Sequence, residues 1–389
     1  MKTFKRHLMT IVLMLLSIGI NADDLITSQV TIKLDKAGTL PNIIGSSRKY
    51  KITNLKLIGD INGDDVSLIR DMAGADYYGK YTSGNLSILD LSEVNIVKGG
   101  DYYDSGFAEY NNNEIGPYFF YECGKLTNIV LPSNVTSIGI LAFGGCDELT
   151  SLEIPSSVTS IEDYAFINCS GLTSIVLSSG VTSIGERTFK GCSGLTSIVL
   201  PSGVTSIGSE AFSGCSGLTN LEIPSGVTSI GERTFYGCSG LTSIVLPSGV
   251  TSIESEAFSG CRGLTNLEIP SSVTWIGKKA FYFCSGLTSI YVSWNTPLRI
   301  SSDVFDMVDK KSCILYIPKG TYQEYWLSNW GDFENIIEYD PTGIDNSSAE
   351  TEIKEISRNA VNGLLLKAPT KGLNIVKYSN GSVRKEMVK

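Results

Sequence analysis

The chain has 389 residues, of which 42% are hydrophobic and 18% charged, a composition that supports a buried core and excludes a disordered chain. Its formal net charge is −9, and an acidic surface repels phosphates and anionic lipids, which argues against nucleic acid and membrane surfaces as partners. The single histidine, His7, lies in the leading segment. A chain processed after that segment therefore lacks the commonest general base and metal ligand.

Residues 1–22 have the pattern of a signal peptide. A basic start precedes a mostly apolar stretch from Leu8 to Ile20, and small residues follow it. This stretch is shorter than the roughly 18 residues that a membrane span needs. We therefore expect cleavage after Ala22, export of the protein to the cell surface or medium, and no transmembrane segment in the processed chain.

Residues 23–85 are predicted to form an N-terminal cap region. Within it, the segment from Asp60 to Asp71 carries oxygen-bearing side chains with the spacing of a calcium loop. The sixth position of such a loop needs glycine for a sharp turn, and here it is Asp65. Residues 66–70 fit better as the start of a short helix capped by Asp64 or Asp65, so no metal site is predicted.

The centre of the chain repeats every 23 residues, and the repeat includes eight of the nine cysteines. A fixed period of this size indicates stacked repeats rather than one closed globule. Four zinc ligands must surround one point, whereas residues one coil apart form a line, so we interpret the cysteines as free thiols facing the core. Disulfides between neighbouring coils are the alternative, because the coil spacing falls within their range. The predicted structural ladder consists of Cys123, Cys146, Cys169, Cys192, Cys215, Cys238, Cys261 and Cys284.

Each repeat contains the pattern Leu-x-x-Leu-x-Ile, whose last three positions alternate as in a short strand with one face inward. A proline such as Pro155 ends that strand, and Val158 and Ile161 form a second inward pair. A single coil cannot bury its apolar side alone, but stacked coils can. The predicted fold is a solenoid of stacked 23-residue coils with short parallel β-strands, little helix, and a cap at both ends.

Two coils have also been copied as a unit. Residues 180–225 and 226–271 match over 46 positions except at three. This near-identity indicates a recent duplication and presents the same side chains twice, about 10 Å apart given the rise of stacked strands.

These repeats resemble the BspA-like class of leucine-rich repeats, found in surface proteins of Bacteroidetes and some parasites. The resemblance covers residues 86–298, with an insertion at 99–113, and residues 299–340 resemble the closing segment that forms the C-terminal cap. It implies a leucine-rich-repeat solenoid that is non-enzymatic, binds no cofactor, and adheres to host extracellular-matrix proteins or to other bacterial surface proteins.

The last residues form a separate segment. Residues 341–357 are polar and are interpreted as a linker. In residues 358–389, apolar residues alternate with other residues on both sides of Asn380-Gly381, and this pattern predicts a β-hairpin. This tail resembles a short form of the sorting segments that direct Bacteroidetes proteins through type IX secretion.

The side chains between the inward positions of each strand must point away from the core, so we predict that they form the binding surface on the concave side. Extended solenoid faces favour extracellular protein ligands. Glycan binding and a structural surface role are the alternatives. The predicted column consists of Asn128, Val130, Glu153, Val176, Val199, Asn220, Glu222, Val245, Asn266, Glu268 and Tyr291.

Three members of this column, Glu153, Glu222 and Glu268, raise the alternative of a glycosidase, which needs two carboxylates about 5 to 10 Å apart. The sequence supplies no aromatic cleft around them, no phosphate-binding loop and no nucleophile elbow, so no catalytic residue is predicted. Aromatic residues gather instead at the two ends of the repeats. We interpret them as cap packing, with a contact surface as the alternative. They are Tyr102, Tyr103, Phe107 and Tyr110 in the insertion, and Tyr291, Trp294, Tyr325, Trp326 and Trp330 near the C-terminal cap.

Overall fold

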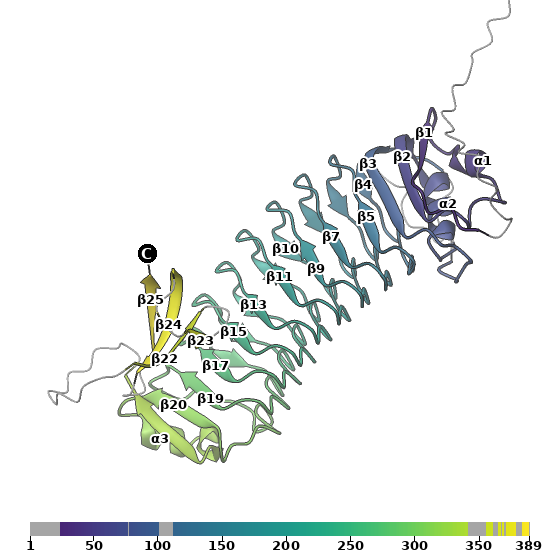
Figure 1. Ribbon diagram of the computed structural model, residues 1–389. Helices are drawn as coiled ribbons and strands as arrows, with labels where there is room; N and C mark the ends of the chain where they lie inside the picture. The colour runs from purple at the N-terminus through teal and green to yellow at the C-terminus, as the bar shows by residue number, and fades with distance from the viewer. Residues whose placement is uncertain are drawn as a thin grey trace, which may run out of the picture.

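The computed structural model describes residues 24–76, 78–100 and 112–340, together with the strands and a few neighbouring residues of 355–388. The chain forms a parallel β-solenoid of about 13 stacked coils spaced about 23 residues apart (Figure 1). The predicted fold class is confirmed. The signal peptide at 1–22, residues 101–111 of the insertion with their four aromatic residues, and residues 341–354 of the linker lie outside the described residues.

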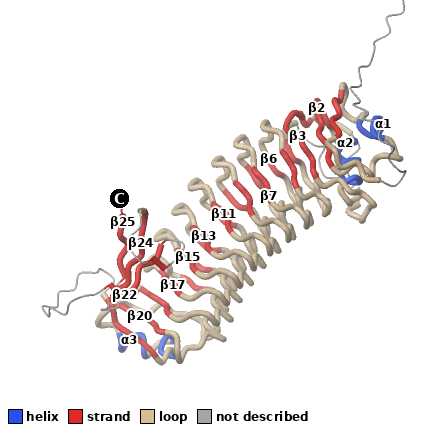
Figure 2. Tube along the Cα trace, in the orientation of Figure 1, coloured by secondary structure: helices blue, strands red, loops and turns tan. Residues whose placement is uncertain are grey.

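Helices occur only near the two ends of the described solenoid, as Figure 2 shows. At the N-terminal end, helix α1 (Leu40–Ile44) and helix α2 (Gly63–Met72) accompany strands β1 (Val30–Leu34), β2 (Asn54–Ile61) and β3 (Ile88–Ile96). These strands pair in parallel in the order β1-β2-β3 and continue into the first three-residue strand of the repeats. The hydrogen-bonded stack therefore begins before the repeats do.

Helix α2 begins at Gly63, three residues earlier than predicted, and its cap is Asn62 rather than Asp64 or Asp65. The Asn62 side chain accepts a hydrogen bond from the Asp64 N–H, which satisfies one of the free amides at the helix start. The buried Asp65 carboxylate accepts hydrogen bonds from the backbone N–H groups of Gly38 (2.6 Å), Leu40 (2.9 Å) and Asn62 (3.0 Å). Asp65 therefore ties α2 to the preceding loop.

Each repeat contributes a strand of three or four residues and a second strand of two residues. Equivalent residues pair in parallel with a shift of 23, as in Ser174 with Ser197. The longer strands are β5 (Asn128–Val130), β7 (Ser151–Glu153), β9 (Ser174–Val176), β11 (Ser197–Val199), β13 (Asn220–Glu222), β15 (Ser243–Val245), β17 (Asn266–Ile269) and β19 (Ser289–Val292). The shorter strands are β4 (Glu114–Ile115), β6 (Ser137–Ile138), β8 (Ser160–Ile161), β10 (Ser183–Ile184), β12 (Ser206–Ile207), β14 (Ser229–Ile230), β16 (Ser252–Ile253) and β18 (Trp275–Ile276).

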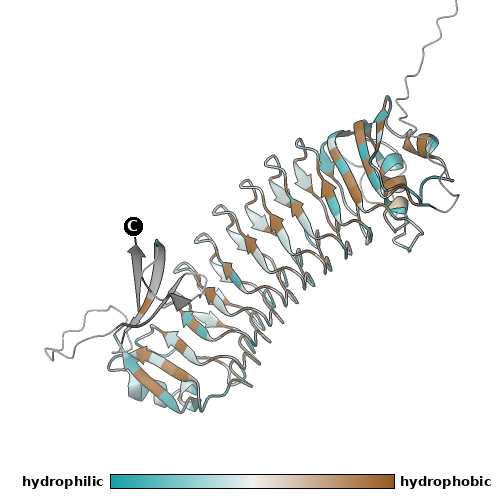
Figure 3. Cartoon of the chain, in the orientation of Figure 1, coloured by the Kyte–Doolittle hydropathy of each residue, from teal (hydrophilic) through white to brown (hydrophobic). Residues whose placement is uncertain are grey.

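The core is a set of side-chain ladders that run along the solenoid axis. Apolar residues alternate with polar residues along the strands, as Figure 3 shows by colour. Phenylalanine rings from successive coils stack, with centroid distances from 5.0 Å between Phe143 and Phe166 to 5.6 Å between Phe212 and Phe235. Each ring packs on the ring before and after it, so the ladder fixes the register of neighbouring coils.

The cysteines form a second ladder beside the phenylalanines. All nine, including Cys313, are buried and free of disulfides in the structure. From Cys146 to Cys284, each thiol donates a hydrogen bond to the carbonyl of the phenylalanine 26 residues earlier, as Cys215 does to Phe189 at 3.1 Å. The thiols thus face backbone carbonyls rather than one another.

The C-terminal end contains strand β20 (Ile314–Pro318), helix α3 (Tyr322–Trp326), a 3-10 helix (Asn329–Asp332) and strand β21 (Asn335–Tyr339). The two strands extend the parallel sheet in the order β17-β19-β20-β21. Tyr325 and Trp330 are fully buried and donate hydrogen bonds to the carbonyls of Trp294 and Leu298, both at 2.8 Å. Cap packing is therefore confirmed for Trp294, Tyr325 and Trp330, whereas Trp326 is 51% exposed.

The tail forms a four-stranded antiparallel sheet in the order β23-β22-β24-β25. Its strands are β22 (Glu355–Ala360), β23 (Leu365–Leu366), β24 (Gly372–Tyr378) and β25 (Val383–Val388). Strands β24 and β25 pair across Asn380-Gly381, so the predicted hairpin is confirmed. Strand β22 begins at Glu355, inside the segment predicted as a linker, because its pairing with β24 extends the sheet.

Candidate binding surface

The outward side chains of the longer strands form one continuous surface along the solenoid, which we call the strand face. All eleven predicted members belong to it, and all are exposed except Asn220 and Tyr291, which are half-buried. The largest exposed fractions belong to Val199 (82%) and Val176 (61%). Tyr291 stacks on Tyr316 with a centroid distance of 4.3 Å, so this end of the column is closed by aromatic contact.

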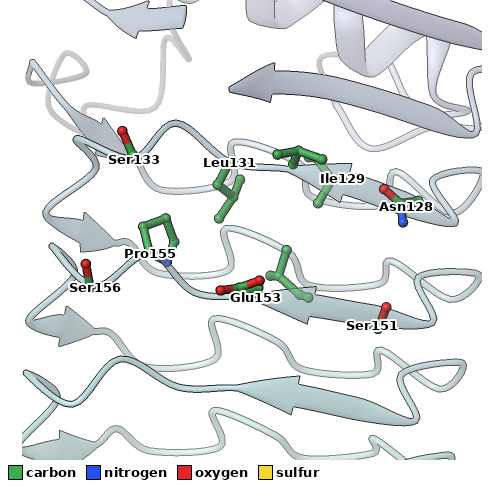
Figure 4. Close-up of a pocket in the computed structure, with 10 residues that line it drawn as sticks. Asn128, Ile129, Leu131, Ser133, Ser151, Glu153, Pro155 and Ser156 are labelled. Carbon is green, nitrogen blue, oxygen red and sulfur yellow. The ribbon is translucent and has the colours of Figure 1, made fainter. Parts of the chain in front are cut away.

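A shallow groove of about 480 Å³ crosses the strand face between β5 and β7. Figure 4 shows Asn128 and Ser151 at one end of the groove, Ser133 and Ser156 at the other, and Glu153 between them. The hydrogen-bonded sheet is interrupted here, and again between β11 and β13 and between β15 and β17. Each interruption comes just before a strand that carries an outward glutamate. The groove offers polar groups to a ligand but is too open to enclose one.

The three glutamates of the strand face have no charged partner within the solenoid. Among the described side chains of residues 24–340, none makes a hydrogen bond or an ion pair with Glu153, Glu222 or Glu268. The other members of the column are neutral. The strand face is therefore a row of uncompensated carboxylates among exposed valines.

Several acidic residues on the turn side of the coils form ion pairs. One repeat position there has positive φ in every coil from Leu141 to Lys279. The side chains at this position pair between neighbouring coils in two places. Arg187 binds Glu210 at 2.5 Å, and Arg233 binds Glu256 at 2.8 Å. The hydrogen bond from Arg187 lowers the pKa of the Glu210 carboxyl, with further help from Lys190. We call this row the turn-side charge ladder.

The flanking glutamates belong to the same network. Glu186 lies 2.9 Å from Arg187 and Glu232 lies 3.6 Å from Arg233. Glu210 and Glu256 thus join neighbouring coils, whereas Glu186 and Glu232 pair with the arginine that follows them in the same coil.

The cysteine ladder offers no reactive thiolate. Burial raises the pKa of the Cys123, Cys238 and Cys284 thiols from 9.0 to about 12, so they stay protonated at neutral pH. Within the described ranges, no three His, Cys, Asp or Glu side chains gather around a point where a metal ion could sit. The cysteines fill space in the core.

Trp275 is the exposed tryptophan that the sequence prediction missed. Trp275 stands in a column that begins with Glu114 and holds serine in the next six coils, from Ser137 to Ser252, and it is 56% exposed. The signal was present in the sequence as a tryptophan that follows this run of serines. Its ring extends from the second row of strands, outside the strand face.

Stacked coils with short parallel strands, inward leucine and isoleucine, and a phenylalanine ladder define a leucine-rich-repeat solenoid. The family model described as "BspA type Leucine rich repeat region (6 copies)" matches residues 113–220 and 205–323. The chain belongs to this BspA-type leucine-rich-repeat family. Such solenoids are typically non-enzymatic scaffolds that bind proteins, and the match indicates no catalytic family.

Solved structures of several bacterial leucine-rich-repeat proteins are similar to the chain. A leucine-rich-repeat protein of T. pallidum is 32% identical, with 42% of this chain and 75% of that chain covered and a TM-score of 0.36. The pneumococcal vaccine antigen PcpA is 18% identical, and the match covers 80% of this chain and 79% of PcpA with a TM-score of 0.43. A leucine-rich cell-surface protein of Faecalibacterium prausnitzii is 23% identical, and the match covers 80% of this chain and 87% of that protein with a TM-score of 0.35. Among curated proteins, no match was found.

None of the helices in the described ranges combines the length and the hydropathy that crossing a bilayer requires.

Proposed function

We propose that this protein is a non-enzymatic, cell-surface or secreted binding protein that attaches to extracellular proteins through the strand face. The observation that carries the proposal is the contrast between the two sides of the coils. On the turn side, Glu210 and Glu256 form ion pairs that join coils, whereas on the strand face Glu153, Glu222 and Glu268 lie beside exposed valines and form no ion pair with the described side chains of residues 24–340. Exposed groups without an internal role are available to a ligand, and several coils together supply the contact area.

The family and the sequence patterns support the cellular setting of this proposal. Residues 1–22 would direct export, and residues 358–389 would act as a short sorting segment of the Bacteroidetes kind. Mass spectrometry of the protein secreted by its native host tests both, since the mature chain should begin at Asp23. A mature chain that still carries the leading segment would contradict export by cleavage.

Binding is tested by a screen of the processed protein against host matrix proteins and bacterial surface proteins. The double variant Glu222→Lys with Glu268→Lys should change binding to the partner found in the screen. The matched variant Glu186→Lys with Glu232→Lys reverses two charges on the turn side and should leave binding unchanged, with its melting temperature measured because it disturbs ion pairs. If only the turn-side pair alters binding, the ligand lies on the other side and the proposal is wrong.

Glycan binding is the second candidate, favoured by Trp275. An exposed indole ring beside a ladder of serine hydroxyls offers a sugar both a stacking platform and hydrogen-bonding groups. A glycan array probed with the protein and with Trp275→Ser, which restores the residue of the preceding coils, separates the two candidates. Array binding that disappears in Trp275→Ser, with no protein partner in the parallel screen, would favour glycan recognition.

A further inference from the structure

The duplicated two-coil unit sets a regular spacing on the strand face. Glu222 and Glu268 occupy the same position two coils apart, and Val245, 44% exposed, lies between them. The core rings of the same three coils are 5.6 Å apart from Phe212 to Phe235 and 5.2 Å apart from Phe235 to Phe258. Two coil steps therefore separate the glutamates by about 10 to 11 Å, close to twice the spacing of stacked strands.

This spacing equals seven residues of an α-helix. A helix rises about 1.5 Å per residue and 5.4 Å per turn, so residues i and i+7 lie on one face about 10.5 Å apart, and one turn matches one coil. An extended strand fits less well, because its same-face residues i, i+2 and i+4 are about 6.8 and 13.6 Å apart. The period of the strand face thus favours a helical partner aligned with the solenoid axis.

The charge of the surface fixes the charge of that partner. Glu222 and Glu268 make no ion pair with the described side chains of residues 24–340, and the column between Val176 and Glu268 contains no basic residue. The valines beside them need apolar contact if water is to be excluded. A partner that satisfies both must carry basic side chains at the glutamate spacing and apolar side chains between them.

We propose that strands β13, β15 and β17 bind a cationic amphipathic helix of a partner protein. Lys or Arg at positions i and i+7 would face Glu222 and Glu268, and apolar residues at i+3 and i+4 would cover Val245. This inference rests on the proposed function, which it narrows from a protein ligand to a helical, basic one.

The test uses the full chain and three synthetic helical peptides of equal length, which differ only in the charged residues described next. The first has Lys at i and i+7 with Leu at i+3 and i+4, the second has Glu in place of both Lys, and the third moves the second Lys to i+5. Fluorescence anisotropy at low salt should show binding of the first peptide, at least tenfold weaker binding of the third, and no binding of the second.

The double variant Glu222→Lys with Glu268→Lys should weaken binding of the Lys peptide at least tenfold and gain binding of the Glu peptide. The variant Glu186→Lys with Glu232→Lys is the matched control and should behave as the unchanged protein. Equal binding of the Lys peptides with either spacing, or equal loss in both double variants, would overturn the proposal. If a protein partner from the screen still depends on Glu222 and Glu268, the proposed function stands without the helix.

The C-terminal segment of the same chain is the competing occupant. Residues 355–389 carry seven basic and two acidic residues. Carbodiimide coupling of the full chain, which joins amines to carboxylates in contact, should leave Lys377 and Lys385 uncoupled to Glu222 and Glu268. Coupling between them would show that the tail already covers this surface and would overturn binding of an external helix.

Discussion

Replacement of Cys215 by alanine measures what one rung of the cysteine ladder contributes. The Cys215 side chain is fully buried, and its thiol donates to the Phe189 carbonyl at 3.1 Å. That carbonyl also accepts the Cys192 N–H at 3.1 Å. It therefore keeps a partner when the sulfur is removed, and the loss comes from packing rather than from an unsatisfied polar group.

The expected loss in the free energy of unfolding follows from the volume of the sulfur atom that Cys215→Ala removes. Burial of an atom group of this size is worth about 0.8 kcal/mol, and the cavity left by one sulfur atom adds roughly 0.5 kcal/mol at 24 cal/mol per Å³. The weak thiol hydrogen bond contributes a few tenths more, so Cys215→Ala should lower the free energy of unfolding by about 1 to 2 kcal/mol. Cys215→Arg should unfold its coil, because a buried charge without a partner costs several kcal/mol.

Urea unfolding followed by circular dichroism gives the free energies, and hydrogen exchange shows whether Cys215→Arg opens only the neighbouring coils. The exposed Ser216 provides the control, since Ser216→Ala should stay within about 0.5 kcal/mol of the unchanged protein. A Cys215→Ala variant as stable as the unchanged protein would refute the packing role of the ladder.

Titration of denatured, unreduced protein should find all nine cysteines as free thiols, and fewer than six would show that neighbouring rungs form disulfides. Because burial raises the folded-state pKa of Cys123, Cys238 and Cys284 from 9.0 to about 12, the stability they contribute is intact below pH 9 and is lost as pH rises toward 12. The melting temperature should therefore fall steeply above pH 9, and a flat profile to pH 11 would contradict the burial of the thiols. Calcium or a chelator should leave the melting temperature unchanged, since the Asp65 carboxylate is held by three backbone amides, and a rise of several degrees with calcium would contradict this. Glu210→Lys should cost about 2 kcal/mol in thermal unfolding by placing three cations together, and an unchanged melting temperature would show that the turn-side charge ladder adds no stability.

The inward side chains made the solenoid predictable from the sequence. Leucine, isoleucine and cysteine recur at fixed offsets every 23 residues, and this period predicts a stack of coils. The alternation of side chains along each strand then predicts which residues point outward. In the two end regions of the solenoid the 23-residue interval is not kept, but the parallel sheet continues. Leu315 pairs with Ile290 on one side and Ile336 on the other, at separations of 25 and 21 residues. Backbone hydrogen bonds do not require identical side chains, so irregular segments join the stack.

The turn-side charge ladder could not be predicted in the same way. Its pairs depend on a left-handed backbone at Arg187 and Glu210, an uncommon conformation for residues other than glycine that the sequence pattern does not announce. The cap of α2 was also missed, because Asn62 and Asp65 act together and single-residue preferences favoured the aspartates. Trp275 was visible in the sequence, but its exposure depends on the packing around β18.

The turn-side charge ladder also restricts how the protein can change in length. Its charges alternate from coil to coil through Arg187, Glu210, Arg233, Glu256 and Lys279. Deleting or inserting one coil would bring like charges face to face, whereas a change of two coils preserves every attraction. Insertions that keep the alternation therefore come in multiples of 46 residues, the size of the unit already copied between residues 180 and 271. Electrostatic parity thus favours recombination products that gain or lose two coils together.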